Sequence, residues 1–375
     1  MRPLRFVALG DSLTEGVGDP VGEAWRGWAA LLAGGLAGGA PGEAPGAVPG
    51  GTSGEVPGGV PAGCAAGTPP RGLADGAAWQ ASGASAGSAG SSECASGGAS
   101  AGSAGSSERA SGGASAGSAE GSPGGPSHAP GGRVEFTNLA VSGAQTRDVL
   151  ERQTPRALAL RPDVVSVVIG VNDTLRYTFD IHAVAARLDE VYAAFRNQGA
   201  VLLTACLPDP GAMLGLPGAL ARPLARRQRA VNAVVHALSE RYGAVHVHAA
   251  EGAWLTDRAL WSADRLHPGE RGHRQLALRF HASLVREGVA TGPGPSPEPE
   301  FPAPTRSASL WWLATAGTGW VARRCTDLLP QLLTLAAAEV RHRARGTSAR
   351  LDLGASHAVA SALAALSVGE QPDAA

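Results

Sequence analysis

Short apolar runs alternate along the chain with longer stretches in which apolar residues recur every three or four positions. The short runs end at turn residues, and the run at 163–169 is continuous and β-branched, which is typical of a strand covered on both faces. These runs predict strands at 4–9, 134–139, 163–169, 200–206 and 244–248. Because helical stretches separate the strands, the pattern predicts one parallel sheet between two helical layers, a three-layer α/β/α fold.

The first helical stretch covers 22–33, where Trp25, Trp28 and Leu32 share a stripe, and its pattern stops at residue 34. Residues 34–132 are rich in Gly, Ala, Ser and Pro and repeat one unit that ends in Ser-Ser-Glu. They hold too little apolar surface to offset the entropy of ordering, so we expect a disordered insertion. A connection of this length costs about 2 kcal/mol more to close than a short one, which a folded domain tolerates.

The later helices are predicted by their apolar stripes and by their end signals. A helix begins near Thr146, Asp180 is the expected N-cap of the next, and Pro268 is expected to start the last. A Pro- and Gly-rich loop is expected at 207–221. The predicted buried faces consist of Ile181, Val184, Leu188, Val191 and Phe195, of Leu224, Val231, Val235, Leu238 and Tyr242, and of Leu276, Phe280 and Leu284.

These patterns divide the chain into a catalytic domain, residues 1–33 and 133–288, a Pro-rich linker at 289–308, and a Trp-containing helical extension at 309–375. Charged residues interrupt the extension too often for a transmembrane helix. We expect its helices to dock on the catalytic domain or to support self-association; the alternative is a peripheral membrane anchor. That anchor would use Trp311, Trp312, Trp320, Arg341, Arg343 and Arg345.

Composition narrows the function classes. The formal charge of -1 gives no global attraction to nucleic acid. The four cysteines, Cys64, Cys94, Cys206 and Cys325, have no metal-type spacing, and the first predicted strand follows Met1 too closely for a signal peptide, so we expect a cytoplasmic protein. His246 and His248 share a strand face, but no third ligand lies at a recognisable spacing, so we expect no metal and no cofactor.

Residues suited to catalysis follow four of the five predicted strands: Ser12, Gly143, Asn172, and Asp264 with His267. The carboxyl ends of parallel strands meet at one edge of a sheet, so these residues are expected to gather there. Ser12 begins a helix after a turn and is a candidate nucleophile, with His267 as its base and Asp264 orienting the imidazole. The backbone N–H groups of Ser12 and Gly143 and the Asn172 amide are candidate oxyanion donors.

Each of these residues also has a structural interpretation. Ser12 can cap a helix, Gly143 can serve a turn, and Asn172 can satisfy nearby backbone groups. Their joint arrangement favours an acyl-enzyme mechanism. The interpretations that stay open are an acyltransferase or deacetylase acting on a sugar or lipid, and a non-catalytic binding module that uses the Trp-rich tail.

Four segments taken together resemble the sequence blocks of the GDSL esterases and lipases, also called SGNH hydrolases. These segments are Gly10-Asp11-Ser12-Leu13, Gly143, Gly170-Val171-Asn172-Asp173 and Asp264-Arg265-Leu266-His267. The resemblance covers residues 5–286 apart from the insertion, which departs from the family's short first crossover. It implies a flavodoxin-like sheet of five strands, no metal, and hydrolysis of small or medium acyl esters or thioesters through Ser12.

Overall fold

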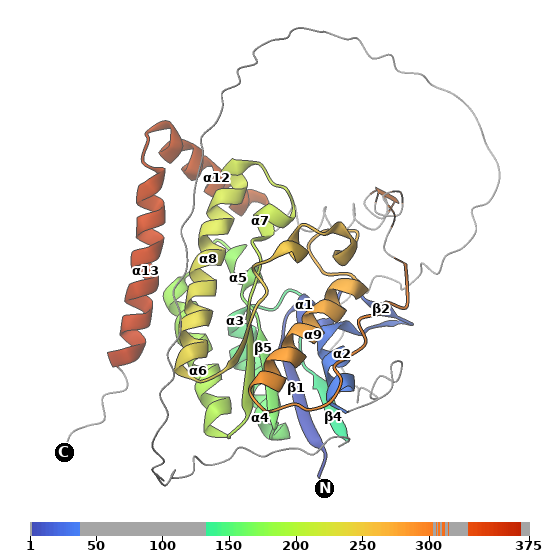
Figure 1. Ribbon diagram of the computed structural model, residues 1–375. Helices are drawn as coiled ribbons and strands as arrows, with labels where there is room; N and C mark the ends of the chain where they lie inside the picture. Colours follow the sequence, from blue (N-terminus) through green and yellow to red (C-terminus); the bar gives the residue numbers. More distant parts are fainter. Residues whose placement is uncertain are drawn as a thin grey trace, which may run out of the picture. The chain divides into compact units, whose positions relative to one another are not determined.

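A five-stranded, fully parallel sheet in the order β4-β1-β5-β6-β7 organises the chain (Figure 1). When only the strands of this sheet are counted along the chain, their order is 2-1-3-4-5, the order of flavodoxin-like folds. The predicted fold class is therefore confirmed. The strands are β1 (Leu4–Gly10), β4 (Val134–Asn138), β5 (Val164–Val168), β6 (Val201–Cys206) and β7 (Val245–His248). All five begin and end within two residues of the predicted runs.

The computed structural model describes residues 2–37, 133–302 and 329–368, with isolated positions between 305 and 314. The predicted disordered insertion at 34–132 lies almost entirely outside the described residues. Trp312 and Trp320 of the extension lie outside them as well.

Helices cover both faces of the sheet (Figure 1). Val7 and Leu9 of β1 face the core under α6 (Ile181–Asn197) and α8 (Gly218–Arg241), whereas Phe6 and Ala8 face the core under α2 (Gly27–Leu36) and α9 (Glu270–Arg286). This alternation follows from the two-residue period of a strand. On the second face Trp28 stacks on Phe280, with ring centroids 4.5 Å apart.

The prediction for residues 22–33 was wrong at its start. Residues 20–25 form a small antiparallel hairpin of β2 (Pro20–Val21) and β3 (Ala24–Trp25), and α2 begins only at Gly27. Gly22 and Gly27 have φ of 61° and 67°, left-handed values that interrupt a helix. Trp25 is therefore half-exposed on the hairpin, while Trp28 is fully buried.

The predicted loop at 207–221 was also partly wrong. It contains a short helix, α7 (Pro210–Met213), and the first turn of α8, which begins at Gly218 and includes Pro223. Pro223 lies inside α8 rather than in its first turn, so it removes one backbone hydrogen bond of the helix. Similarly, α9 begins at Glu270 with Gly269 as its N-cap, two residues after the proline expected to start it.

The other predicted helices are present. Asp180 caps α6 by accepting a hydrogen bond from the His182 N–H. The segment from Thr146 forms α3 (Thr146–Asp148), a π-helical turn η1 (Val149–Gln153) and α4 (Thr154–Leu160). Four further short helices are α1 (Ser12–Glu15), α5 (Val171–Thr174), η2 (Ala253–Leu255) and η3 (Arg258–Leu260).

The C-terminal extension contains α12 (Leu329–Ala344) and α13 (Ser348–Val368), which pack against α8 and α6. Ala362 of α13 is buried and belongs to the same hydrophobic cluster as the buried residues of α6 and α8. Arg226 of α8 pairs with the buried Glu339 of α12 at 3.1 Å. Within the described residues, no helix is long and apolar enough to cross a bilayer.

Candidate functional site

Ser12, His267 and Asp264 form one continuous hydrogen-bonded row. The Ser12 Oγ lies 2.8 Å from His267 Nε2, and His267 Nδ1 lies 2.6 Å from Asp264 Oδ2. The imidazole and the carboxylate are mostly buried, while Ser12 is half-buried at the start of α1. A hydroxyl, an imidazole and a carboxylate in this order can activate the hydroxyl as a nucleophile.

The loop that carries Asp264 is shaped around its carboxylate. Oδ1 accepts hydrogen bonds from the Ser262 hydroxyl and from the backbone N–H groups of Leu266 and His267. Burial alone raises the pKa of Asp264, but the hydrogen bonds and positive charge of His267 outweigh it and lower the pKa to about 2. Asp264 is therefore a carboxylate throughout the neutral range and fixes the Nδ1–H tautomer of His267.

Ser12 is held at the end of β1 by Gly10. Gly10 has a φ of 152°, and a Cβ there would lie 2.3 Å from the Val168 carbonyl oxygen, so only glycine fits beside β5. The Gln153 amide exchanges two 2.9 Å hydrogen bonds with the backbone of Gly10. Asp11 then caps α1 by accepting from the Leu13 N–H. The sharp turn therefore directs the Ser12 hydroxyl toward His267.

The predicted oxyanion donors lie on adjoining loops. The Asn172 amide donates to Asp11 Oδ2 at 3.2 Å and to the Ala144 carbonyl at 3.1 Å, the neighbours of Ser12 and Gly143. Gly143 adopts a φ of 82°, a value that favours glycine. Both Asn172 N–H groups have acceptors of their own, so an oxyanion has to share one of them.

Two acidic residues that the sequence analysis did not assign to the site brace these loops. Glu15 of α1 accepts from both the backbone N–H and the hydroxyl of Ser142, directly before Gly143. Asp173, directly after Asn172, accepts from the backbone N–H and, at 2.7 Å, from the hydroxyl of Thr146. Their positions beside predicted site residues were the only sequence signal for this role.

Asp11 is an acidic residue next to Ser12, close to the hydrogen-bonded row of Ser12, His267 and Asp264. Burial raises the pKa of Asp11 to about 6, despite the opposing effects of the Leu13 N–H and the charge of His267. Its carboxylate therefore gains or loses a proton near the ordinary pKa of histidine. At neutral pH it is charged and accepts the Asn172 amide.

A charged cavity adjoins the oxyanion loops. Its lining includes Gln145, two residues after Gly143, and Asp173, and it extends to α6. The remaining lining is dominated by charged side chains: Arg147, Asp148, Glu151, Arg152, Arg176, Asp180 and Arg187. Ser12, Gly143, Asn172 and His267 are not among the residues that line this cavity.

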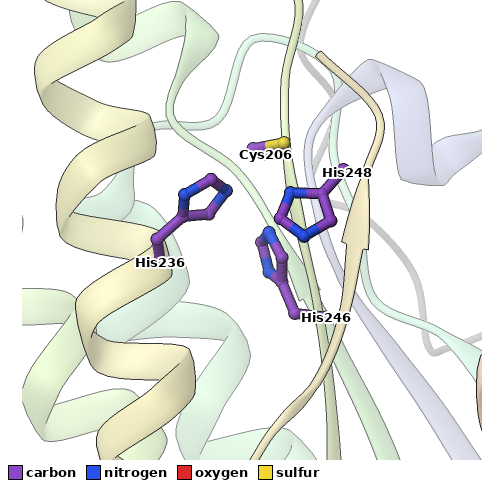
Figure 2. A group of neighbouring side chains, drawn as sticks. All are labelled: Cys206, His236, His246 and His248. Carbon is purple, nitrogen blue, oxygen red and sulfur yellow. The ribbon is translucent and has the colours of Figure 1, made fainter. Parts of the chain in front are cut away.

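The residues suited to hold a metal ion form a separate group. Cys206, His236, His246 and His248 place their ligand atoms within 4.8 Å of one another (Figure 2). The sequence analysis had paired only His246 and His248. It missed His236 and Cys206 because these residues come from a helix and a neighbouring strand, at spacings that match no short metal motif.

Comparison with known proteins identifies a matching family and a relative of known name. Residues 110–275 match the GDSL-like Lipase/Acylhydrolase family, a range that includes every proposed site residue except Ser12. An acetylxylan esterase of Geobacillus stearothermophilus is 30% identical over 167 residues, which cover 42% of this chain and 74% of that protein.

Solved structures give weaker likenesses. The crystal structure of Axe2, an acetylxylan esterase from Geobacillus stearothermophilus, has a TM-score of 0.44 at 17% identity and covers 77% of this chain and 97% of its own. LAE5, an α/β hydrolase from a lake metagenome, has a TM-score of 0.42 at 16% identity with the same coverage.

Proposed function

This chain belongs to the GDSL-like lipase/acylhydrolase family and is an ester-hydrolysing enzyme, and on that premise we propose that Ser12 is its nucleophile. His267 Nε2 takes the Ser12 proton as Oγ attacks the ester carbonyl carbon. The resulting oxyanion is held by the N–H groups of Ser12 and Gly143 and by Asn172. His267 then protonates the leaving alcohol or thiol, and water, deprotonated by the same imidazole, releases the acid and restores Ser12.

The observation that carries this proposal is the hydrogen-bonded row itself. His267 Nε2 lies 2.8 Å from Ser12 Oγ, and Nδ1 lies 2.6 Å from Asp264 Oδ2. These distances support the proposal, because a base at this distance can reach the proton that it must remove and a carboxylate bonded to Nδ1 can stabilise the imidazolium.

We propose acetyl esters of a carbohydrate as the favoured substrate class among small acyl esters. Two observations support this choice. The curated relative is an acetylxylan esterase, and the cavity beside Asp173 is lined mainly by charged side chains. A sugar offers many hydroxyls to such a wall, whereas a long acyl chain would desolvate these charged groups without offering them hydrogen bonds.

We also propose that the catalytic domain comprises residues 1–33 and 133–288, with the helical extension docked on it. Packing of α12 and α13 on α8 and α6 supports this arrangement. The segment after α9 is tied to the domain too, since Glu270 accepts the backbone N–H groups of Glu300 and Phe301. The peripheral membrane role and self-association are the alternatives; binding of the full chain to lipid vesicles, or a dimer in solution, would favour them.

The test is an activity screen of the full chain on p-nitrophenyl acetate, p-nitrophenyl butyrate and acetylated xylose. We expect turnover with the acetyl esters and a loss of at least about 10⁴-fold in kcat for Ser12→Ala. Ser356→Ala, on the exposed face of α13, is the matched control and should keep full activity. A fluorophosphonate probe should label the peptide that contains Ser12.

Unchanged turnover in Ser12→Ala would contradict the proposed nucleophile. Preference for butyrate over the acetylated sugar would contradict the substrate class while leaving the nucleophile intact. Adding a sugar acceptor separates hydrolase from acyltransferase, because a hydrolase releases free acetate and a transferase yields the acylated acceptor.

A further inference from the structure

Three imidazoles and a thiol converge on the face of the sheet covered by α8 (Figure 2). Cys206 ends β6, His246 and His248 lie on β7, and His236 comes from α8. The three imidazole centroids are 4.6 to 5.0 Å apart. None of these residues takes part in the ester hydrolysis proposed above.

Strand register explains why the two strands supply one site. Thr204 of β6 is paired with His246 of β7, and Cys206 is paired with His248. Since side chains two residues apart share a face, all four point to the same side of the sheet. The helix α8 packs on that side and contributes His236. The backbone thereby sets the position of all four groups.

Hydrogen bonds fix the tautomer of His246. Ser239 donates its one hydroxyl proton to the Val235 carbonyl at 2.6 Å, so Thr204 is the donor in its 2.7 Å bond to Ser239. The Thr204 oxygen then accepts from His246 Nδ1 at 2.9 Å. His246 therefore carries its proton on Nδ1, and its Nε2 presents a lone pair to the cluster.

That lone pair has no partner in the described chain. The Nε2 atoms of His246 and His236 are both buried without a hydrogen bond. Buried polar atoms are normally paired, so two unpaired imidazole nitrogens within one cluster of potential ligands point to a missing ligand. A metal ion is the ligand that accepts several nitrogen lone pairs at once.

The thiol completes the set of potential ligands. The Cys206 sulfur accepts the Ala250 N–H at 3.5 Å, and its ligand atom lies within 4.8 Å of those of the three imidazoles.

We propose that Cys206, His236, His246 and His248 bind one Zn²⁺ ion in tetrahedral coordination. Four protein ligands of this type make a closed, structural site. Bonds of about 2.0 Å to nitrogen and about 2.3 Å to sulfur separate the ligand atoms by roughly 3.3 to 3.5 Å, so the side chains move together by about 1 Å on binding. His248 is exposed and provides the entry side, and the Cys206 proton leaves to solvent as the Zn–S bond forms.

The ion would clamp the edge strand β7 to β6 and to α8. β7 is an edge strand with a single neighbour, and the chain that leaves it leads to the Asp264 and His267 loop. Zinc removal should therefore lower the melting temperature of the full chain. The site lies outside the hydrogen-bonded row of Ser12, so the ion itself takes no part in the ester chemistry.

The experiment uses the full chain without an affinity tag, freed of metal by a chelator and then titrated with Zn²⁺. We expect one Zn²⁺ per chain by elemental mass spectrometry and a higher melting temperature. Co²⁺ in place of Zn²⁺ should give the visible bands of a tetrahedral site and a thiolate charge-transfer band that Cys206→Ser removes. His236→Ala should weaken Zn²⁺ binding at least about 100-fold.

Two further variants complete the test. Thr204→Val removes the acceptor of His246 Nδ1–H together with the hydrogen bond to Ser239, and should weaken binding about 10- to 100-fold. His182→Ala, on α6 away from the cluster, is the matched control and should bind Zn²⁺ as the parent does. If His236→Ala fails to fold, His248→Ala at the exposed corner replaces it. Absence of stoichiometric Zn²⁺ binding by the parent, or unchanged binding in both His variants and in Cys206→Ser, overturns the proposal.

Discussion

Ser12 and His267 are 255 positions apart in sequence, yet their Oγ and Nε2 atoms lie 2.8 Å apart. The segment that follows the edge strand β7 brings His267 back to Ser12. It crosses the carboxyl edge of the sheet to the end of β1, an interior strand. Trp254 and Trp261 of this segment are buried, and the Trp261 indole N–H donates to the Trp254 carbonyl at 3.1 Å. The packed loop therefore positions the His267 imidazole without help from a strand.

Asp264→Asn should lower kcat by about 10⁴-fold on p-nitrophenyl acetate. An asparagine amide in place of Oδ2 presents a donor to His267 Nδ1, which favours the wrong imidazole tautomer and no longer stabilises the imidazolium. Asp257→Asn is the control, because Asp257 also accepts a backbone N–H in the same loop but does not contact His267. A kcat for Asp264→Asn within tenfold of the parent would contradict the assigned role.

Asn172→Ala should lower kcat by about 10²- to 10³-fold with little change in KM, since an oxyanion donor acts on the transition state. Asn197→Ala, at the exposed end of α6, is the matched control. An increase in KM at unchanged kcat would instead indicate that Asn172 only binds the substrate in its ground state.

Glu15→Gln tests a positioning residue. Both Ser142 groups donate to the same Glu15 oxygen, Oε2, and a neutral amide oxygen accepts hydrogen bonds more weakly than a carboxylate does, so the loop of Gly143 should be held less firmly. We expect kcat to fall by about 10- to 100-fold while KM and the melting temperature stay close to the parent's. Glu135→Gln, exposed on β4, should leave all three unchanged. Equal losses in stability and activity would indicate a merely structural role.

The sheet was predictable because each strand is a short apolar run between turn residues, and chain order with right-handed crossovers then limits the topology. The start of the first helix was not predictable. Trp25 and Trp28 have helical spacing, but Gly22 and Gly27 take left-handed conformations that cannot be recognised from this spacing. The candidate site residues follow strand ends, and the structure brings Ser12, His267 and Asp264 into hydrogen-bonding contact.

What the sequence analysis missed depends on contacts between distant segments. The hydrogen bonds from Ser142 to Glu15 connect segments on either side of the insertion, and no local sequence pattern predicts them. His236 joins His246 and His248 only because α8 packs over two strands in a fixed register. Local periodicity predicts elements, whereas such pairs require the tertiary arrangement.

Arg226→Ala should loosen α12 from the catalytic domain. Arg226 pairs with Glu339, whose side chain is only 2% exposed, and its loss leaves a buried carboxylate without its partner. Breaking such a pair costs about 3 kcal/mol or more of the free energy of unfolding. Arg229→Ala is the matched control on the same helix, because its 3.7 Å contact with Asp352 is exposed and contributes little. Hydrogen exchange of residues 329–368 should quicken in the first variant only, with esterase activity retained in both.

His273 should make the fold sensitive to acid. The Trp28 backbone N–H donates to His273 Nδ1, so Nε2 carries the proton and donates to the Val17 carbonyl at 3.1 Å. Burial lowers the pKa of His273 to about 4, although Asp19 nearby opposes this effect. The unfolded chain, with a histidine pKa near 6.5, then binds more protons than the folded chain between pH 6.5 and 4. The free energy of unfolding must fall as the pH drops through that window, by up to roughly 3 kcal/mol from this residue.

His273→Gln isolates this contribution, because the amide can still accept from Trp28 and donate to the Val17 carbonyl but does not titrate. Urea unfolding at several pH values from 4 to 8 should show a shallower decline for His273→Gln than for the parent, whatever the variant's stability at pH 8. His357→Gln, exposed on α13, should keep the parent's pH dependence. Parallel curves for the parent and His273→Gln would mean that His273 is not held neutral in the folded chain.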